Sequence, residues 1–292
     1  MDSLAGVPAY RVAMIGRAVA LALGRYQWLD IGERLGRRSS HEDWQAAHDR
    51  TAAALHDLGI RLGGFFVKLC QVAGARADVL PEPFVRRLGR FHDRVPPRPF
   101  EVMGPALERE LGRPLREVFR SFDEQPLAAA SLAQVHRAVL RDGEEVAVKI
   151  QYPDIARLAR IDLASLRRAM RVAALLQPNF DLRSIVEEVA HLVSLELDFE
   201  LEASATERVR LAFAGDPGVR VPRVHHQYST PRLLVLEYLH GLRIADVGAL
   251  RDAGHDPRAI AAEVGRLYGT MIFQHGFFQG DPHPGNLLVL PG

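Results

Sequence analysis

The strongest constraint on the fold of this chain is a change in hydrophobic periodicity near its middle. Before residue 127 apolar residues recur at helical spacing, whereas residues 134–140 and 145–150 alternate apolar and polar side chains as half-buried strands do. Asp142 and Gly143 lie between the two runs, and Asp-Gly is a strong signal for a tight hairpin turn. The sequence therefore predicts a β-hairpin, within a mostly helical chain, whose second strand "EVAVKI" ends near Lys149.

Lys149 is unusual because this chain almost never uses lysine. It has 37 lysine and arginine residues together, and Lys68 and Lys149 are the two lysines among them. Arginine serves equally well as a solvated cation, so a retained lysine indicates a site where a compact ammonium is needed and a forked guanidinium does not fit. The alternative is that the two lysines remain by chance, and their surroundings must decide.

Other periodic segments define the expected architecture. Helical patterns cover residues 42–94, with a break at Pro81 and Pro83; a further helix should begin near residue 100, and others cover residues 153–176, 181–214 and 257–275. The stretch "RVPRVHHQYSTPRLLVLEYLHG" contains two candidate strands, the second over residues 233–238, and "LLVL" follows the loop "GDPHPGN" as a short strand. We expect an α+β protein divided into residues 1–120, 121–240 and 241–292.

Bulk composition excludes several classes of function. A formal net charge of +1 argues against a nucleic-acid-binding surface over the whole molecule, so no nucleic-acid partner is expected. The single cysteine, Cys70, excludes an internal disulfide and any multi-cysteine metal site, which fits a reducing compartment. The cytoplasm is therefore the expected location.

The first thirty residues contain an apolar tract that is interrupted by Arg11, Arg17 and Arg25. The tract does not reach the roughly 18 uninterrupted apolar residues of a membrane-spanning helix, and it lacks the cleavage site of a secretory signal. It predicts an amphipathic helix that packs on the protein body or lies at the inner face of a membrane, with Tyr26 and Trp28 as interfacial anchors. Packing on the body is the favoured alternative.

Chemistry-bearing residues follow one another in the order used by protein kinases. Such an enzyme needs an ammonium for the nucleotide phosphates, a helix carboxylate that holds it, an Asp beside the acceptor and an Asn for Mg²⁺. Lys149, a glutamate in residues 181–214, Asp281 and Asn286 supply these groups in that order. The segment "LEYL" at 236–239 is expected to be the hinge that takes the adenine edge. Each motif is weak alone, whereas the ordered set is specific.

Two departures from ordinary kinases point to a narrower family. The phosphate loop reads "AAAS" at 128–131 where kinases use glycines, and the catalytic loop reads "DPHPGN" at 281–286. Here the chain resembles the UbiB/AarF (ADCK) family of atypical kinase-like proteins, which is associated with ubiquinone biosynthesis. The resemblance covers about residues 60–292 and includes "KLCQ" at 68–71, similar to the family's K-x-G-Q, "ELD" at 196–198, similar to E-x-D, and the "GDPHPGN" loop.

The resemblance implies a protein-kinase-like fold with a helical N-terminal extension, a small β-containing N-lobe and a helical C-lobe that is incomplete here. It implies that Lys68 folds over the active site and meets the E-x-D carboxylates, which favours a small molecule or lipid over a protein as phosphate acceptor. Expected catalytic residues are Asp281, Lys149, Lys68, Glu196 and Asp198; expected nucleotide contacts are Ala128, Ala129, Ala130, Ser131, Lys149, Glu202, Glu237 and Leu239; and the expected metal ligand is Asn286.

The implied cofactors are ATP or ADP with Mg²⁺, and the implied partners are a nucleotide, a lipid or quinone-pathway molecule or enzyme, and a peripheral membrane surface. A catalytically inactive nucleotide-sensing scaffold is the alternative, because the chain contains no D-F-G after Asn286 to supply the second metal ligand. A helical adaptor without a ligand is a third interpretation, but it leaves the ordered motifs and the two lysines unexplained.

For single residues, a purely structural role stays an alternative to a functional one. The acidic run around Glu196 could be a solvated helix face, the alanine loop a simple small-residue turn, the 236–239 segment a buried strand end, and His283 part of a hydrogen-bond framework. Glu196 and Asp198 differ by about 200° on an unbroken helix, so both can face one small site only if the helix is distorted there. Cys70 replaces the motif's glycine, which would matter if that position needs a positive φ.

Overall fold

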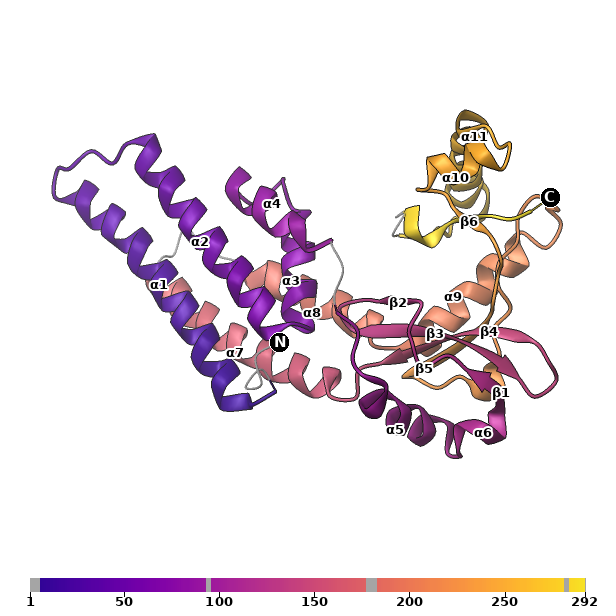
Figure 1. Ribbon diagram of the computed structural model, residues 1–292. Coiled ribbons are helices and arrows are strands. Elements are labelled where there is room, and N and C mark those ends of the chain that lie inside the picture. The colour runs from indigo at the N-terminus through magenta and orange to yellow at the C-terminus, as the bar shows by residue number, and fades with distance from the viewer. Residues whose placement is uncertain (1–5, 93–95, 177–182, 281–283, 292) are drawn as a thin grey trace.

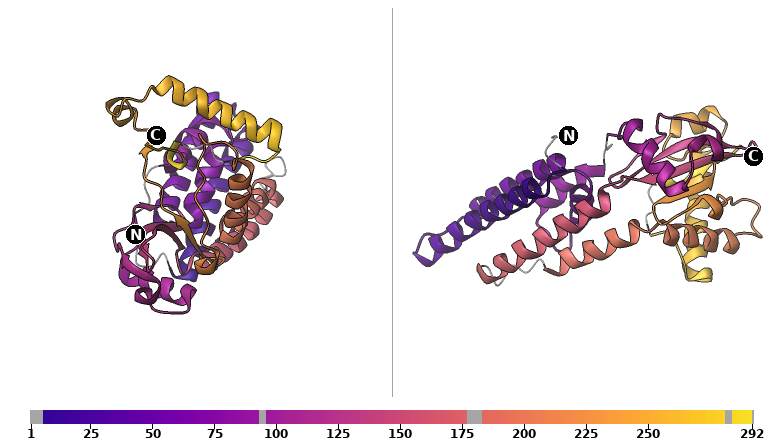
Figure 2. Two further views of the ribbon diagram at one scale, coloured as in Figure 1. Left: turned by 90° about the vertical axis from the view of Figure 1, so that its right-hand side faces the viewer. Right: turned by 90° about the horizontal axis from the view of Figure 1, so that it is seen from below.

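The computed structural model describes residues 6–92, 96–176, 183–280 and 284–291. One end of the molecule is a group of helices and the other end is a small sheet flanked by shorter helices (Figure 1). The helical group consists of α1 (Pro8–Arg34), α2 (His41–Leu62), α3 (Phe65–Gly74), α4 (Glu82–Leu88), the short 3₁₀ helix η1 (Gly89–His92), α7 (Ile155–Leu176) and α8 (Arg183–Glu196). Figure 2 shows that α1, α2 and α7 extend away from the sheet, which makes the molecule elongated.

Local sequence signals explain how the second helix begins and ends. Ser40 caps α2 in a reciprocal capping box, in which its hydroxyl accepts from the amide of Asp43 and the Asp43 carboxylate accepts from the amide of Ser40. At the other end Gly63 and Gly64 have φ angles of 62° and 53°, which glycine adopts without strain. The two glycines turn the chain sharply into α3, the helix that carries Lys68.

The sheet is antiparallel, with the order β1 (Phe119–Phe122), β3 (Ala133–Leu140), β4 (Glu145–Gln151) and β5 (Leu233–Glu237), and β2 (Ala128–Ala129) pairs with β3. The predicted hairpin is confirmed as β3 and β4, although β4 continues to Gln151, two residues beyond Lys149. In its register Lys149 lies opposite Val135 on one side and Leu234 on the other. The helices α5 (Phe100–Leu111) and α6 (Leu115–Val118) precede the sheet.

The C-terminal part leaves the sheet after β5. It consists of β6 (Leu242–Arg243), α10 (Val247–Asp252), α11 (Pro257–Thr270), the π-helical turn η3 (Met271–His275), the 3₁₀ turn η4 (Pro284–Asn286) and β7 (Leu288–Val289). β6 pairs with β7 as a small second sheet, and α10 and α11 lie above the first sheet in Figure 1.

A continuous cluster of buried apolar side chains joins the helical group to the sheet. It includes Ile15 of α1, Phe65 of α3 and Ile155 of α7, together with Val148 and Ile150 of β4. Burial of apolar surface is the dominant favourable term in folding, so this shared cluster holds the helices and the sheet together. The favoured prediction for the N-terminal tract is confirmed, because α1 packs against α2 and α7. None of the described helices combines the length and the apolar character that a bilayer crossing needs.

The structure corrects two predicted elements. The expected helix over residues 181–214 is two helices, α8 and α9 (Phe199–Ala212), with a break at Leu197 and Asp198. The first candidate strand of the 220–241 stretch forms an isolated bridge between Val224 and Leu236, followed by the 3₁₀ helix η2 (His226–Tyr228). The helix break has no local signal because apolar residues keep helical spacing across it, and the contacts that hold it come from β4 and from the segment before β5.

Candidate functional site

Lys149 and Glu202 form the centre of the candidate site. Lys149 lies on β4 and Glu202 in the first turns of α9, and Nζ of the lysine donates to both carboxylate oxygens, at 2.7 and 2.6 Å. The side chains are 29% and 40% exposed, so the pair opens to solvent and to a ligand. Nζ also lies 4.7 Å from the centre of the Phe199 ring, which attracts a cation electrostatically. We expected a glutamate within residues 181–214 to hold Lys149, and in the structure Glu202 is the residue that pairs with it.

Packing of α9 on the sheet explains why the two side chains meet. Val146, Val148 and Ile150 of β4 are fully buried in the main core, so the alternation of the strand places Lys149 on the opposite face. On that face Phe199 and Ala203 of α9 pack against Leu234 in a separate buried cluster. Phe199 therefore seats α9 on the sheet three residues before Glu202, and the ion pair follows from this seating.

The second lysine makes a second ion pair. Lys68 on α3 contacts the carboxylate of Glu196, the last residue of α8. The helix ends there, and Asp198 becomes the N-cap of α9, with its carboxylate accepting from the amide of Glu200 at 3.0 Å. The structure thus brings Lys68 to one member of the E-x-D motif, whereas the other member caps the helix that carries Glu202. The distortion that the spacing required is present as a complete break.

Gln151 holds this break in place. Its side-chain amide donates to the carbonyl of Leu197 at 2.8 Å and to that of Pro231 at 3.2 Å, while the amide of Phe199 donates to the Pro231 carbonyl at 3.0 Å. Gln151 is 3% exposed, so these bonds satisfy a buried polar group as well as two helix-terminal backbone groups. Gln151 was not among the predicted site residues, although a polar residue at the end of an apolar strand is a signal in the sequence.

The α3 segment accommodates Cys70 without unusual backbone geometry. Cys70 lies inside a regular helix, and no described residue other than glycine has a positive φ. Its thiol packs close to Gly59 of α2, where an added Cβ would come within 3.2 Å of Sγ and 2.6 Å of the Phe91 ring. Burial raises the pKa of the Cys70 thiol to about 12, so the side chain remains a neutral thiol. The neighbouring Gln71 donates to the carbonyl of Phe91 at 2.8 Å.

The alanine-rich segment forms one arm of a hairpin with β3. Ala128 and Ala129 pair with Val135 and Gln134, and the amide of Ala130 donates to the carbonyl of Ala133 at 2.8 Å. The Ala130 amide is therefore already bonded within the protein. Ser131, another of the predicted nucleotide contacts, lies at the turn itself and has a buried side chain. The segment expected to be a phosphate loop is thus partly a strand, β2, and the turn itself lies at residues 130–132.

The predicted hinge lies at the end of β5. The amide of Glu237 donates to the carbonyl of Arg223, and its carboxylate pairs with Arg220 and accepts from the amide of Arg223 at 3.2 Å. Burial opposes ionisation of Glu237, but these hydrogen bonds outweigh it and hold the pKa of the carboxyl below its usual value. The Glu237 side chain and amide are thus engaged in fixing the strand end, and the next amide, of Tyr238, donates to the carbonyl of Glu145 at 3.0 Å. Leu239 is half-buried in the segment that follows.

The catalytic-loop residues are only partly described. Asp281 and His283 lie outside the described residues, whereas Asn286 is exposed at the end of η4, directly before the small second sheet. Within the described part of the chain, no group of three His, Cys, Asp or Glu side chains could hold a metal ion. Mg²⁺ is commonly bound through one or two protein groups and the phosphates of its nucleotide, so such a cluster is not required for it.

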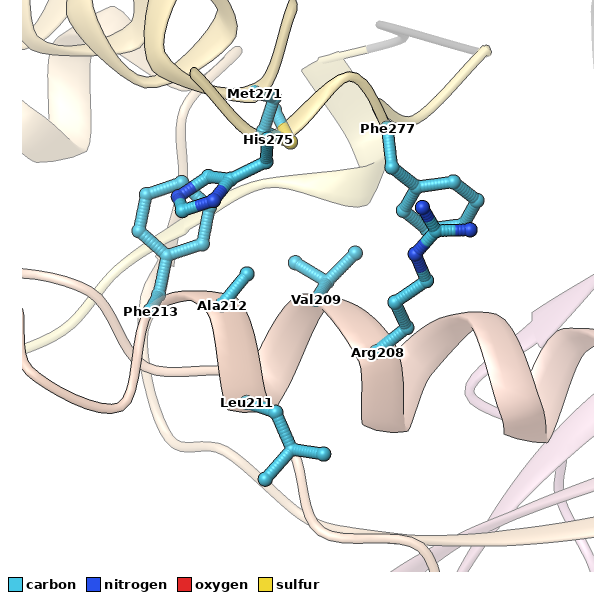
Figure 3. A pocket seen from close by; sticks show the side chains of 8 residues that line it. All are labelled: Arg208, Val209, Leu211, Ala212, Phe213, Met271, His275 and Phe277. Carbon is cyan, nitrogen blue, oxygen red and sulfur yellow. The ribbon is translucent and has the colours of Figure 1, made fainter.

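A groove of about 340 Å³ lies farther along α9 (Figure 3). Val209 and Ala212 of α9 form one side of it, facing Met271 and His275 of η3. At one end the guanidinium of Arg208 stacks 4.0 Å from the centre of the Phe277 ring. None of the predicted site residues lines this groove, and its contacts connect α9 to the C-terminal part.

Comparison with known proteins agrees with this geometry. Residues 90–291 match the model of the ABC1 atypical kinase-like domain. The chain belongs to this family. AarF domain-containing protein kinase 1 of Xenopus tropicalis is 36% identical over 284 residues, which is 96% of this chain and 54% of the relative. The chloroplastic protein ACTIVITY OF BC1 COMPLEX KINASE 7 of Arabidopsis thaliana is 38% identical over 255 residues, covering 86% of this chain and 36% of the relative.

A solved structure supports the same fold for this ABC1-family chain. The structure of the Rv3197–erythromycin complex from Mycobacterium tuberculosis superposes with a TM-score of 0.57 and 30% identity, over 86% of this chain and 64% of that one. The predicted family and the predicted α+β, kinase-like fold are both confirmed. The chain spans about half the length of the curated relatives it matches.

Proposed function

We propose that this chain is the nucleotide-binding part of an atypical kinase-like protein that takes ATP or ADP with Mg²⁺, and whose chemistry is phosphoryl transfer or ATP hydrolysis. The observation that carries the proposal is the Lys149–Glu202 pair, in which a strand lysine is held by both oxygens of a helix carboxylate. A protein kinase must assemble this pair before it can position the nucleotide phosphates. The half-exposed state of the pair leaves the ammonium accessible to an anionic ligand.

Each residue has a role on this proposal. Lys149 addresses the α- and β-phosphates as a point charge, and Glu202 keeps its ammonium in position. The amides of the turn that contains Ser131 and the backbone of the 236–239 segment contact the phosphates and the adenine edge. Asp281 positions the attacking group and takes its proton, and Asn286 holds Mg²⁺ together with phosphate oxygens. When bound, the metal neutralises the charge that develops on the phosphates.

The acceptor is proposed to be a small molecule or lipid. Support comes from Lys68, because its contact with Glu196 ties α3 of the helical group to the helix break beside the site. By the family resemblance, this arrangement would occlude the place where a protein substrate lies in ordinary kinases. An acceptor or an enzyme from quinone synthesis is the finer proposal, which rests on the family resemblance alone.

Peripheral membrane contact is proposed for α1. Support comes from its exposed apolar side chains, among them Leu21, Trp28 and Ile31, which are 47%, 69% and 49% exposed. Trp at a surface of this kind suits the interface between water and lipid. Sedimentation of the purified chain with anionic vesicles tests the proposal, with Trp28→Ser expected to weaken binding. Equal sedimentation of the wild type with and without vesicles would contradict it.

The experiment that tests the central proposal is a thermal unfolding series of the purified chain with ADP or ATP, each with and without Mg²⁺. A ligand that binds the folded state selectively stabilises it, by about 2.7 kcal/mol when the ligand is present at about 100 times its Kd. This stabilisation raises the midpoint temperature of unfolding. We expect a rise that Lys149→Met abolishes and that Arg141→Met, a change on the exposed hairpin turn, retains. A cooperative transition without any nucleotide-dependent shift would refute the proposal. A shift without turnover would favour the nucleotide-sensing scaffold instead.

A further inference from the structure

We propose that Tyr152 is a positioning residue for nucleotide binding, which fixes the alanine-rich turn relative to Lys149 by bonding both of its arms. The inference rests on the proposed function, because it concerns how the same site holds its ligand. Tyr152 directly follows β4, and Lys149 is on that strand. Residues 149–152 would therefore set the distance between the Lys149 ammonium and the alanine-rich turn, both of which contact the phosphates on the proposed function.

Two hydrogen bonds join Tyr152 to the turn. Its amide donates to the carbonyl of Leu132 at 3.0 Å, and its hydroxyl donates to the carbonyl of Ala130 at 3.1 Å. Ala130 and Leu132 stand on either side of Ser131, so the two bonds hold the turn from both sides. The hydrogen bond from the Tyr152 amide continues the pairing of β3 with β4, whereas the hydrogen bond from the hydroxyl depends on the tyrosine side chain.

The hydroxyl bond fixes the orientation of a peptide group. A trans peptide is planar, and its carbonyl and its N–H point in opposite directions. Because the Ala130 carbonyl points to Tyr152, the amide of Ser131 points away from Tyr152. The Ala130 amide is already bonded to Ala133, so the Ser131 amide is the group whose direction the hydroxyl controls. An N–H held in one direction before binding is a preorganised donor for an anion.

Tyr152 is itself held firmly. It is 4% exposed, and the Arg98 guanidinium lies 4.4 Å from the centre of its ring. Arg98 is fixed in turn, because it pairs with Asp154 at 2.6 Å and its backbone exchanges hydrogen bonds with the Gln134 side chain. Burial raises the pKa of the Tyr152 hydroxyl to about 12, so the hydroxyl remains a donor throughout the physiological range.

Tyr152→Phe removes the hydroxyl and keeps the ring under Arg98. A hydrogen bond of this kind contributes modestly, so we expect ADP and ATP to bind about three- to tenfold more weakly to the variant. The matched control is Tyr228→Phe, which removes a hydroxyl from a partly buried tyrosine whose ring also lies near an arginine, 5.6 Å from the Arg113 guanidinium. Titration calorimetry with each nucleotide measures the affinities, and thermal unfolding verifies that both variants fold.

A second measurement needs no nucleotide. Amide hydrogen exchange of a peptide covering residues 127–133 should be faster in Tyr152→Phe than in the wild type and unchanged in Tyr228→Phe, because loss of the bond frees the turn. Weaker binding together with faster exchange supports the inference. Wild-type affinity in Tyr152→Phe, or unchanged exchange, would overturn it while the proposed function stands. A wild-type chain that binds no nucleotide would overturn the proposed function and the positioning role together, and exchange would still show whether Tyr152 restrains the turn.

Discussion

At the scale of single residues, Glu202 is the carboxylate on which the candidate site depends. Glu202→Gln keeps the size of the side chain and removes the charge that holds Lys149. We expect the nucleotide-dependent rise in the unfolding midpoint to fall substantially, because an unpaired lysine no longer stays in one orientation. Glu200→Gln is the control, since Glu200 is exposed two residues earlier on the same helix. Equal shifts in wild type and Glu202→Gln would show that the ion pair has no role in binding.

His136 provides a prediction about pH. It is 0% exposed, its Nδ1 lies 2.8 Å from the carbonyl of Asp123 and its Nε2 lies 2.8 Å from the side-chain nitrogen of Gln134. The carbonyl can only accept, so Nδ1 carries the proton and Nε2 accepts from the amide of Gln134. Burial is the main cause that lowers the pKa of His136, against a smaller opposing effect of its bond to Asp123. The folded protein therefore holds a neutral imidazole.

The sign of the effect follows from linkage. Because the folded pKa is below the unfolded value of about 6.5, the unfolded chain binds the proton more readily. The contribution of His136 to stability is complete above that value and is lost as the pH falls toward the folded pKa. Unfolding free energies in urea from about pH 7.5 to about pH 5.5 should decrease more steeply for the wild type than for His136→Gln. Parallel curves for the two proteins would contradict the assignment.

At the scale of elements, the break between α8 and α9 places Glu196 at the end of one helix, where it contacts Lys68, and Asp198 at the start of the next, which it caps. Asp198→Ala removes the N-cap of α9 and should cost about 1 kcal/mol of unfolding free energy. Asp256→Ala is a matched control, because Asp256 caps α11 through the equivalent bond, to the amide of Arg258 at 2.9 Å. We expect similar losses of stability in urea unfolding, but a reduced nucleotide-dependent shift only for Asp198→Ala. Equal nucleotide responses would mean that the start of α9 does not influence Glu202.

At the scale of the whole molecule, a buried ion pair links the N-terminal helix to the helix that follows the sheet's hairpin. Arg11 of α1 pairs with Asp162 of α7, both side chains being almost completely inaccessible, and also donates to the Leu62 carbonyl at 2.8 Å. Leu62 is the last residue of α2, directly before the glycines that lead into the Lys68 helix. The contact therefore joins three helices of the group at one point.

Removing one partner of this pair leaves a buried charge. Arg11→Met should lower the free energy of unfolding by about 3–5 kcal/mol, as measured in urea at neutral pH. The double variant Arg11→Met with Asp162→Leu should recover part of that loss, since replacing both charges by apolar groups removes the desolvation cost. Arg17→Met, on an exposed face of the same helix, is expected to change stability by less than about 0.5 kcal/mol. If the double variant is no more stable than Arg11→Met, the unpaired charge of Asp162 is not the cause of the stability that Arg11→Met loses.

Much of this architecture was predictable because it depends on local patterns. Alternating residues on both sides of Asp142 and Gly143 specified the hairpin, and the retained lysines pointed to two positions that both form ion pairs with carboxylates. The order of the motifs predicted a kinase-like fold, and the residues within the motifs carried the resemblance to the family. Strand alternation and turn chemistry depend on residues that are adjacent in the sequence, so they can be recognised without knowing any tertiary contact.

Only the tertiary structure decided how the pieces meet. Gln151 at the end of β4 bonds the helix break at Leu197, 46 residues away, and Tyr152, the next residue, bonds the alanine-rich turn at Ala130, 22 residues away. Likewise the packing of α7 against α1, with Arg11 and Asp162 151 residues apart, has no local signal. A hydrogen bond or an ion pair between distant residues forms only after the core has brought its partners together. The sequence by itself determined which groups this protein could use, and the packing of its helices on the sheet decided which of them face one another.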